Sequence, residues 1–143
     1  MELSQQDWDR LQENLDYSND DMELFKKNPR NMKVIAKAPE LMSKTIIFEV
    51  VDSHGCASQH KKGDKFYFDG AGNLLTKLNP KKICIFALNA MASQIFTTSE
   101  LIYAGADPNE MMFKRTGCFD VGIRCGGWGH IIFELSVKDR EYR

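Results

Sequence analysis

The chain has 143 residues, of which 43% are hydrophobic and 27% charged, and its formal net charge is −1. This length and composition are typical of one globular domain and exclude a fibrous or disordered chain. A net charge near zero argues against a protein dedicated to nucleic acid or anionic membranes, because both partners need a strong basic excess. No apolar run reaches the roughly 18 residues of a membrane span, and the polar first residues do not resemble a signal peptide. We therefore expect a cytoplasmic protein without a membrane or nucleic-acid partner.

The first 44 residues predict an arm of short helices. Ser4, with an acid three residues later, has the spacing of a helix-capping box. Asn19 begins a second helix with two acids in its first turn. Pro29 can open a third helix, which we expect Pro39 to interrupt.

The charges of this arm are unevenly distributed. Residues 1–23 have a net charge of −7, whereas residues 24–44 have a net charge of +5. Short helices with a narrow apolar face are not stable alone, so the arm must dock on something. We expect residues 1–44 to join copies of the chain in a homo-oligomer or to attach it to a larger enzyme complex.

Residues 45–143 predict a core domain of strands and one long helix. The expected strands are residues 45–51, 65–69, one or two within 112–125, and 131–137, and the expected helix is 80–103. Gly105 is a plausible cap for the end of that helix. This order predicts an α+β fold with one small, mostly antiparallel sheet packed on a long central helix.

Two histidines and a cysteine, which can bind metals or act as catalytic groups, lie close together directly after the first strand. They belong to the segment His54-Gly55-Cys56-Ala57-Ser58-Gln59-His60. Loops held by a rigid sheet are common places for binding and catalytic sites. Thiolate and imidazole are ligands that zinc prefers, although no Cys-x-x-Cys pair occurs in the chain. The segment therefore predicts a Cys/His site without specifying its metal.

A glycine-rich segment follows later in the chain. Five of the ten glycines lie between residues 117 and 129. No helix start and no Lys-Ser/Thr pair follows them, so a wide hairpin turn with Trp128 as a hydrophobic lid fits better than a phosphate-binding loop. Trp128 and Asp120 are the candidate residues for binding a small-molecule ligand or cofactor.

Several motifs resemble those of a known family: Gly55-Cys56, His60, Gly63-Asp64-Lys65-Phe66, Phe68-Asp69-Gly70, Cys84-Ile85-Phe86-Ala87-Leu88-Asn89-Ala90 and Cys118-Phe119-Asp120. They resemble a family of small uncharacterised proteins of bacteria and archaea with the pattern Gly-x-Cys-x3-His-x2-Gly-Asp-x-Phe. The resemblance covers residues 45–137. The chain lacks the proline that usually follows the second and third cysteines, and it has the additional Cys125. The resemblance implies a shared fold and a Cys/His site, but no particular reaction.

The resemblance groups four residues into one prospective site for a zinc or iron ion, with two substitutes: Cys56, His60, Cys84 and Cys118, then Cys125 and His54. Isolated reduced thiols are the competing interpretation. Cys84 falls on the apolar face of the expected helix, where a cysteine commonly acts as a small hydrophobic residue.

Two functions remain open at this point. The leading hypothesis is a small metal- or thiol-dependent binding or accessory protein with its site around Cys56 and His60. The alternative is a thiol enzyme that acts on a small molecule, with Cys56 as nucleophile and His60 lowering the pKa of its thiol. The sequence does not decide whether the chain is an enzyme.

Overall fold

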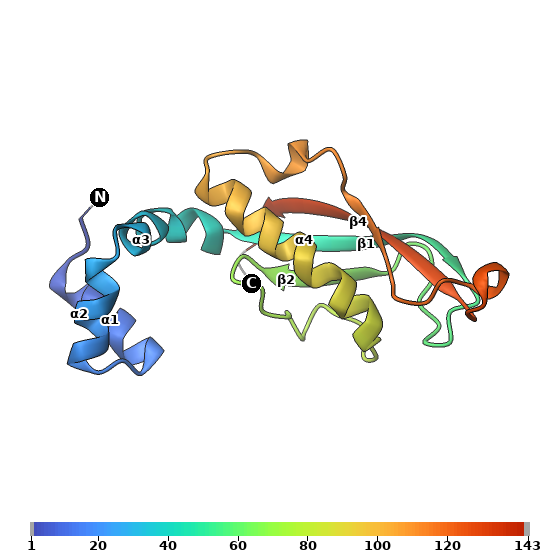
Figure 1. The fold of residues 1–143 in the computed structure, drawn as a ribbon, viewed down its shortest axis with the longest axis horizontal. Helices are drawn as coiled ribbons and strands as arrows, with labels where there is room; N and C mark the ends of the chain where they lie inside the picture. The colour runs from blue at the N-terminus through green and yellow to red at the C-terminus, as the bar shows by residue number, and fades with distance from the viewer. Residues whose placement is uncertain (1, 142–143) are drawn as a thin grey trace. The chain divides into compact units, whose positions relative to one another are not determined.

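The computed structural model describes residues 2–141, which form two compact units, residues 2–39 and 40–141 (Figure 1). The first unit holds α1 (Gln5–Leu15), α2 (Asn19–Lys27) and most of α3 (Pro29–Met42). The expected capping box opens α1 at Ser4, and Ser18 opens α2 with a second one. The expected interruption at Pro39 is wrong, because α3 continues through it to Met42 although an interior proline forfeits one helix hydrogen bond.

The second unit is built on a four-stranded antiparallel sheet in the order β2-β1-β4-β3. The strands are β1 (Lys44–His54), β2 (Lys65–Asp69), β3 (Arg115–Gly117) and β4 (His130–Asp139). The long helix α4 (Ile85–Tyr103) and a short 3₁₀ turn, η1 (Pro108–Glu110), connect β2 to β3. A second 3₁₀ turn, η2 (Ile123–Cys125), lies between β3 and β4. The predicted α+β fold and its element order are confirmed.

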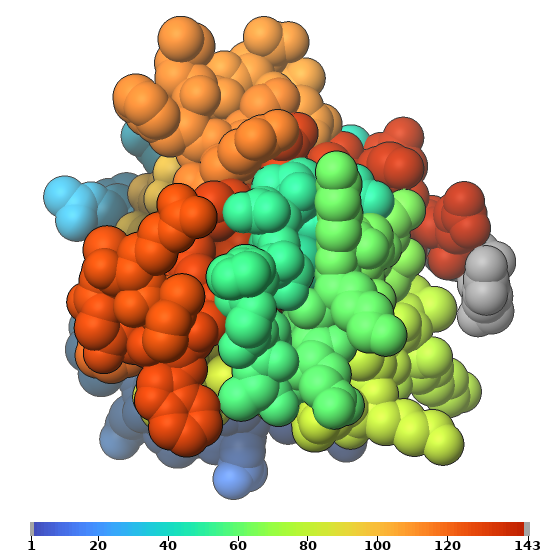
Figure 2. Space-filling model, turned by 90° about the vertical axis from the view of Figure 1, so that its right-hand side faces the viewer, coloured from blue at the N-terminus to red at the C-terminus, as the bar shows by residue number. Residues whose placement is uncertain are grey.

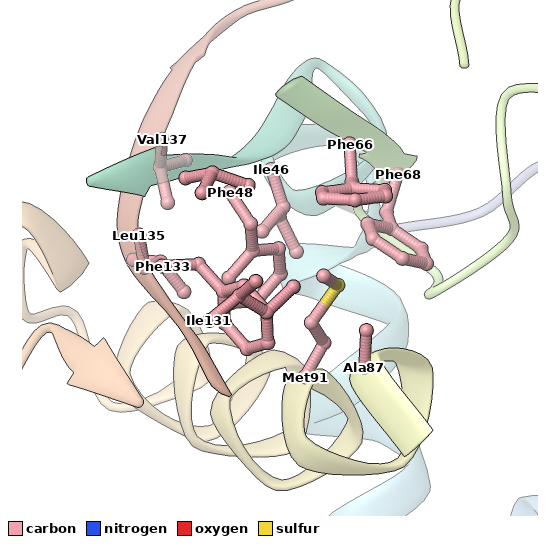
Figure 3. Close-up of a cluster of buried hydrophobic side chains, with 11 residues drawn as sticks. Ile46, Phe48, Phe66, Phe68, Ala87, Met91, Ile131, Phe133, Leu135 and Val137 are labelled. Carbon is pink, nitrogen blue, oxygen red and sulfur yellow. The ribbon is translucent and has the colours of Figure 1, made fainter. Parts of the chain in front are cut away.

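The hydrophobic core lies between the sheet and α4 (Figure 3). Along β4, buried and half-buried side chains alternate, as expected for a strand with one face on the core. Ala87 and Met91 point from α4 toward the aromatic side chains of the sheet. The ring of Phe48 meets those of Phe68 and Phe133 edge to face, at centroid distances of 5.8 and 6.3 Å.

The start of α4 differs from the sequence prediction. The helix begins at Ile85 instead of residue 80, and Cys84 is its extended N-cap residue. A helix beginning at residue 80 would send the Cys84 N–H to the carbonyl of that residue, but it donates to Nε2 of His60 at 3.2 Å. Cys84 therefore lies at the helix N-terminus instead of within the apolar face. At the other end, Gly105 follows the last turn with φ +78°, as its predicted capping role requires.

Within residues 2–141, no helix combines the length and the apolar character that crossing a membrane would require.

Candidate functional site

Three segments meet at one end of the sheet. They are the β1–β2 loop (residues 55–64), the N-terminus of α4 and the β3–β4 loop (residues 118–129). His60 joins the first two through its bond with Cys84, and the rings of Phe86 and Phe119, 5.8 Å apart, join the last two. Figure 2 views this end of the molecule and shows the β1–β2 loop, in teal to green, beside the orange-red β3–β4 loop. Most of the candidate residues lie at this end.

His60 is buried, with 4% of its surface exposed, and it packs edge to face on Phe66 at 5.1 Å. Its burial lowers the pKa of the imidazole, Asp64 opposes this effect, and Lys82 adds to it. The ring is therefore neutral at neutral pH. Since Nε2 accepts the Cys84 N–H, the proton resides on Nδ1. His60 thus holds the start of α4 in place.

The lowered pKa of His60 makes a pH-dependent contribution to stability. As pH falls below about 6.5, the unfolded chain binds a proton at this histidine before the folded chain does, so the folded state loses stability. This loss is at most about 1.4 kcal/mol per pH unit for one proton. It stops growing once the pH falls below the pKa of His60 in the folded state. His60→Gln is expected to reduce the slope of unfolding free energy against pH between 7.5 and 5.5. The measurement is urea unfolding, and His54→Gln, at an exposed histidine, is the control that keeps the slope.

Cys84 is a half-buried thiol at the N-terminus of α4. Burial alone would raise the pKa of this thiol. The backbone N–H groups of Ala87 and Phe86 and the hydroxyl of Ser58 stabilise the thiolate and outweigh burial, so the pKa lies below its ordinary value. A helix N-terminus commonly activates cysteines in this way, because its free N–H groups and dipole favour negative charge.

Cys56 and Cys118 are also half-buried, and both pack against the same hydrophobic core as Cys84. The thiol of Cys118 donates to the carbonyl of Asp120 at 3.7 Å and accepts the N–H of Ile131 at 3.4 Å. Its sulfur lies 3.6 Å from Nδ1 of His130, which also contacts the Asp120 carbonyl. Cys118 is therefore engaged with the beginning of β4.

Sequence reasoning missed two residues of this region, Ser58 and His130. Ser58 lies midway between Cys56 and His60 in the motif that the sequence analysis had identified. His130 directly follows the glycine-rich segment and lies opposite His54 in the pairing of β4 with β1. Their positions could have suggested them, but their contacts with Cys84 and Cys118 depend on the tertiary fold.

Asp120 organises the β3–β4 loop. Its carboxylate accepts the N–H groups of Gly122 at 2.9 Å, Trp128 at 3.0 Å and Gly129 at 3.0 Å. The bonds from Gly129, Gly122 and Trp128 lower the pKa of this carboxyl group. All three donors belong to the same loop, so these bonds shape it. The Trp128 side chain is 78% exposed, and ligand binding by Trp128 and Asp120 stays a prediction.

The six residues predicted as metal ligands fall into two groups. Cys56, His60, Cys84 and Cys118 all contact the core or the start of α4, whereas Cys125 and His54 are exposed. Within the part of the chain that the structure describes, no three His, Cys, Asp or Glu side chains are arranged to hold a metal ion. The zinc or iron site stays a prediction.

No protein-family model, curated protein or solved structure matches this chain. The resemblance to the small bacterial and archaeal family therefore also stays a prediction, and the proposed function depends on the geometry of the chain itself.

Proposed function

We propose that this chain is a small thiol-dependent binding protein whose reactive group is the thiolate of Cys84. The observation that carries the proposal is the position of this cysteine, at the N-terminus of α4 with its pKa lowered. A thiolate binds soft metal ions and electrophilic centres, whereas a protonated thiol is a poor ligand and nucleophile. The ligand is accordingly a small thiophilic species.

The surroundings of Cys84 support this function. The Nε2 atom of His60 accepts the backbone N–H of Cys84, and the Ser58 hydroxyl reaches its sulfur. Both residues lie in the segment 54–60 together with Cys56. This segment would therefore position the thiol of Cys84, which comes from a different part of the chain. His60 is a positioning residue in this proposal, because it holds the backbone of Cys84.

The side chains next to Cys84 also suit a partly apolar ligand. The rings of Phe86 and Phe119 lie at the same end of α4, and 55% of Phe86 and 75% of Phe119 are exposed. Exposed aromatic rings beside a reactive group provide apolar contact area for a small ligand. Cys56 and Cys118, which pack on the same core, are the neighbouring thiols of the proposed site.

The test is the rate of alkylation of Cys84 by iodoacetamide as a function of pH, with the modified cysteine identified by peptide mapping. We expect a midpoint below about 8.5, the value of an ordinary thiol. Ser58→Ala is expected to raise this midpoint and to slow the reaction at pH 7 several-fold, because it removes one stabilising hydrogen bond. Cys125→Ser removes an exposed thiol outside the site and should leave the profile unchanged.

A midpoint of Cys84 at or above about 8.5 would contradict the proposal. If Cys84 is reactive, elemental analysis of anaerobically purified protein distinguishes a metal ion from an electrophilic small molecule as its ligand. Stoichiometric zinc or iron that is lost in both Cys84→Ala and Cys56→Ala would identify a metal ion as the ligand. A metal-free protein with a reactive Cys84 would indicate an electrophilic small molecule.

A further inference from the structure

The helix α4 carries large apolar side chains on both of its sides. Ala87 and Met91 face the core, while Phe86 and Phe96 on the opposite side are 55% and 68% exposed. Residues 83–99 contain no charged side chain. A surface helix normally carries charged residues among the polar ones on its outer side, which α4 lacks over this stretch. The exposed residues Phe86, Asn89, Ser93 and Phe96, here called the outer face of α4, therefore form a surface suited to a partner.

This outer face continues into an adjacent loop. Met112 and Phe113 are almost fully exposed, and a groove of about 280 Å³ runs between them and α4. The side chain of Gln94 donates to the carbonyl of Phe113 at 3.3 Å and attaches the loop to the helix. Contiguous exposed apolar surfaces of this kind commonly mark interaction sites.

The distribution of charge indicates which partner fits. A face without charges can meet an identical face without repulsion between like charges. The nearest exposed charges have opposite signs at the two ends of the helix, with Lys81 and Lys82 before its N-terminus and Glu100 near its C-terminus. Two copies packed antiparallel would bring the basic end of each helix to the acidic end of the other. The same arrangement pairs the opposite ends of the two helix dipoles.

We propose that the outer face of α4 is the interface of a homodimer in which two α4 helices pack antiparallel about a two-fold axis. The axis crosses the outer face at the level of Met91, whose own side chain faces the core. Positions equally distant from Met91 then oppose each other, as a closed isologous interface requires. Phe86 of one copy meets Phe96 of the other, and Asn89 meets Ser93, two polar side chains that can hydrogen-bond to each other. The antiparallel arrangement also brings the segment before each α4, which carries Lys81 and Lys82, near Glu100 of the other copy. The dimer would cover part of Phe86, which is also a ligand contact in the proposed function, but its test does not depend on the reactivity of Cys84.

The test is the oligomeric state of the full chain, measured by sedimentation over a range of concentrations. We expect a dimer, and Phe96→Glu should raise its dissociation constant by about a hundredfold, because one charge would enter each of the two symmetric Phe86–Phe96 contacts. Leu24→Glu, at an equally exposed apolar residue of α2, is the matched control and should leave the dimer intact. Circular dichroism checks that both variants fold.

Charge reversal tests the antiparallel register itself. Glu100→Lys is expected to weaken the dimer by about tenfold, since each new lysine would lie near the basic segment that precedes α4 of the partner, at two symmetric places. The double variant Lys82→Glu with Glu100→Lys should restore the original dissociation constant. A chain that is monomeric at every concentration would overturn the proposal, and so would a dimer that is lost in Leu24→Glu but kept in Phe96→Glu. Failure of the double variant to recover affinity would refute the antiparallel register.

Discussion

Replacing Phe133 with alanine is expected to lower the free energy of unfolding by about 4 kcal/mol. Phe133 lies in β4 with 0% of its surface exposed. Its ring centroid is 6.3 Å from that of Phe48 and 6.4 Å from that of Phe66. The loss has two sources, namely the transfer free energy of the ring and the cavity left among neighbours that cannot all move inward.

The measurement is chemical unfolding in urea, with Ile132→Ala as the matched control. Ile132 is the neighbouring residue of the same strand, but its side chain points to the opposite face of the sheet and is half-buried. We expect this control to cost about 1 kcal/mol, because solvent already reaches much of the side chain. Equal losses in the two variants would show that the face toward α4 does not form the principal core.

Gly129→Ala is expected to lower the free energy of unfolding by about 3 kcal/mol. A Cβ atom at this position would lie 2.0 Å from the carbonyl oxygen of Gly55 and 2.7 Å from the backbone nitrogen of Cys56. Both are backbone atoms, so rotation of a side chain cannot relieve the overlap. The two loops would have to separate, which would also stretch the bond from the Gly129 N–H to Asp120.

The matched control for this variant is Gly126→Ala in the same loop. Nothing lies within 4 Å of a Cβ atom there, and only the positive φ of 90° opposes the substitution. This left-handed conformation costs a residue other than glycine about 1 kcal/mol. Thermal unfolding of the two variants side by side gives the comparison. Equal destabilisation would mean that the close approach of the two loops contributes nothing.

Much of the fold could be predicted from local sequence patterns. The strand at 65–69 and the last strand carry β-branched and aromatic residues, and the apolar positions of α4 recur at helical spacing. The order of the strands in the sheet could not be predicted in this way. It depends on which strands pair across long separations, and the central pair joins β1 to the distant β4.

The site was predictable only in part, for a similar reason. The motif around Cys56 and His60 was visible because its residues are close together in the sequence. The position of Cys84 at the N-terminus of α4 was not visible in the sequence, because the start of α4 depends on a hydrogen bond to His60, 24 residues earlier. Without that bond, the apolar pattern alone favours a longer helix with Cys84 inside it. The thiol that we propose as reactive therefore differs from the one that the sequence indicated.

The pairing of β1 with β4 also has a consequence for how the chain folds during synthesis. β1 begins at residue 44 and its partner β4 ends at residue 139. The central strand pair of the sheet therefore connects segments from near the two ends of the second unit. The ribosome releases α4 before it releases β4, and until then the core-facing side of this helix lacks the strand that completes the core. We expect the nascent chain to remain unfolded, and to be a substrate for chaperones, until residues 130–139 emerge.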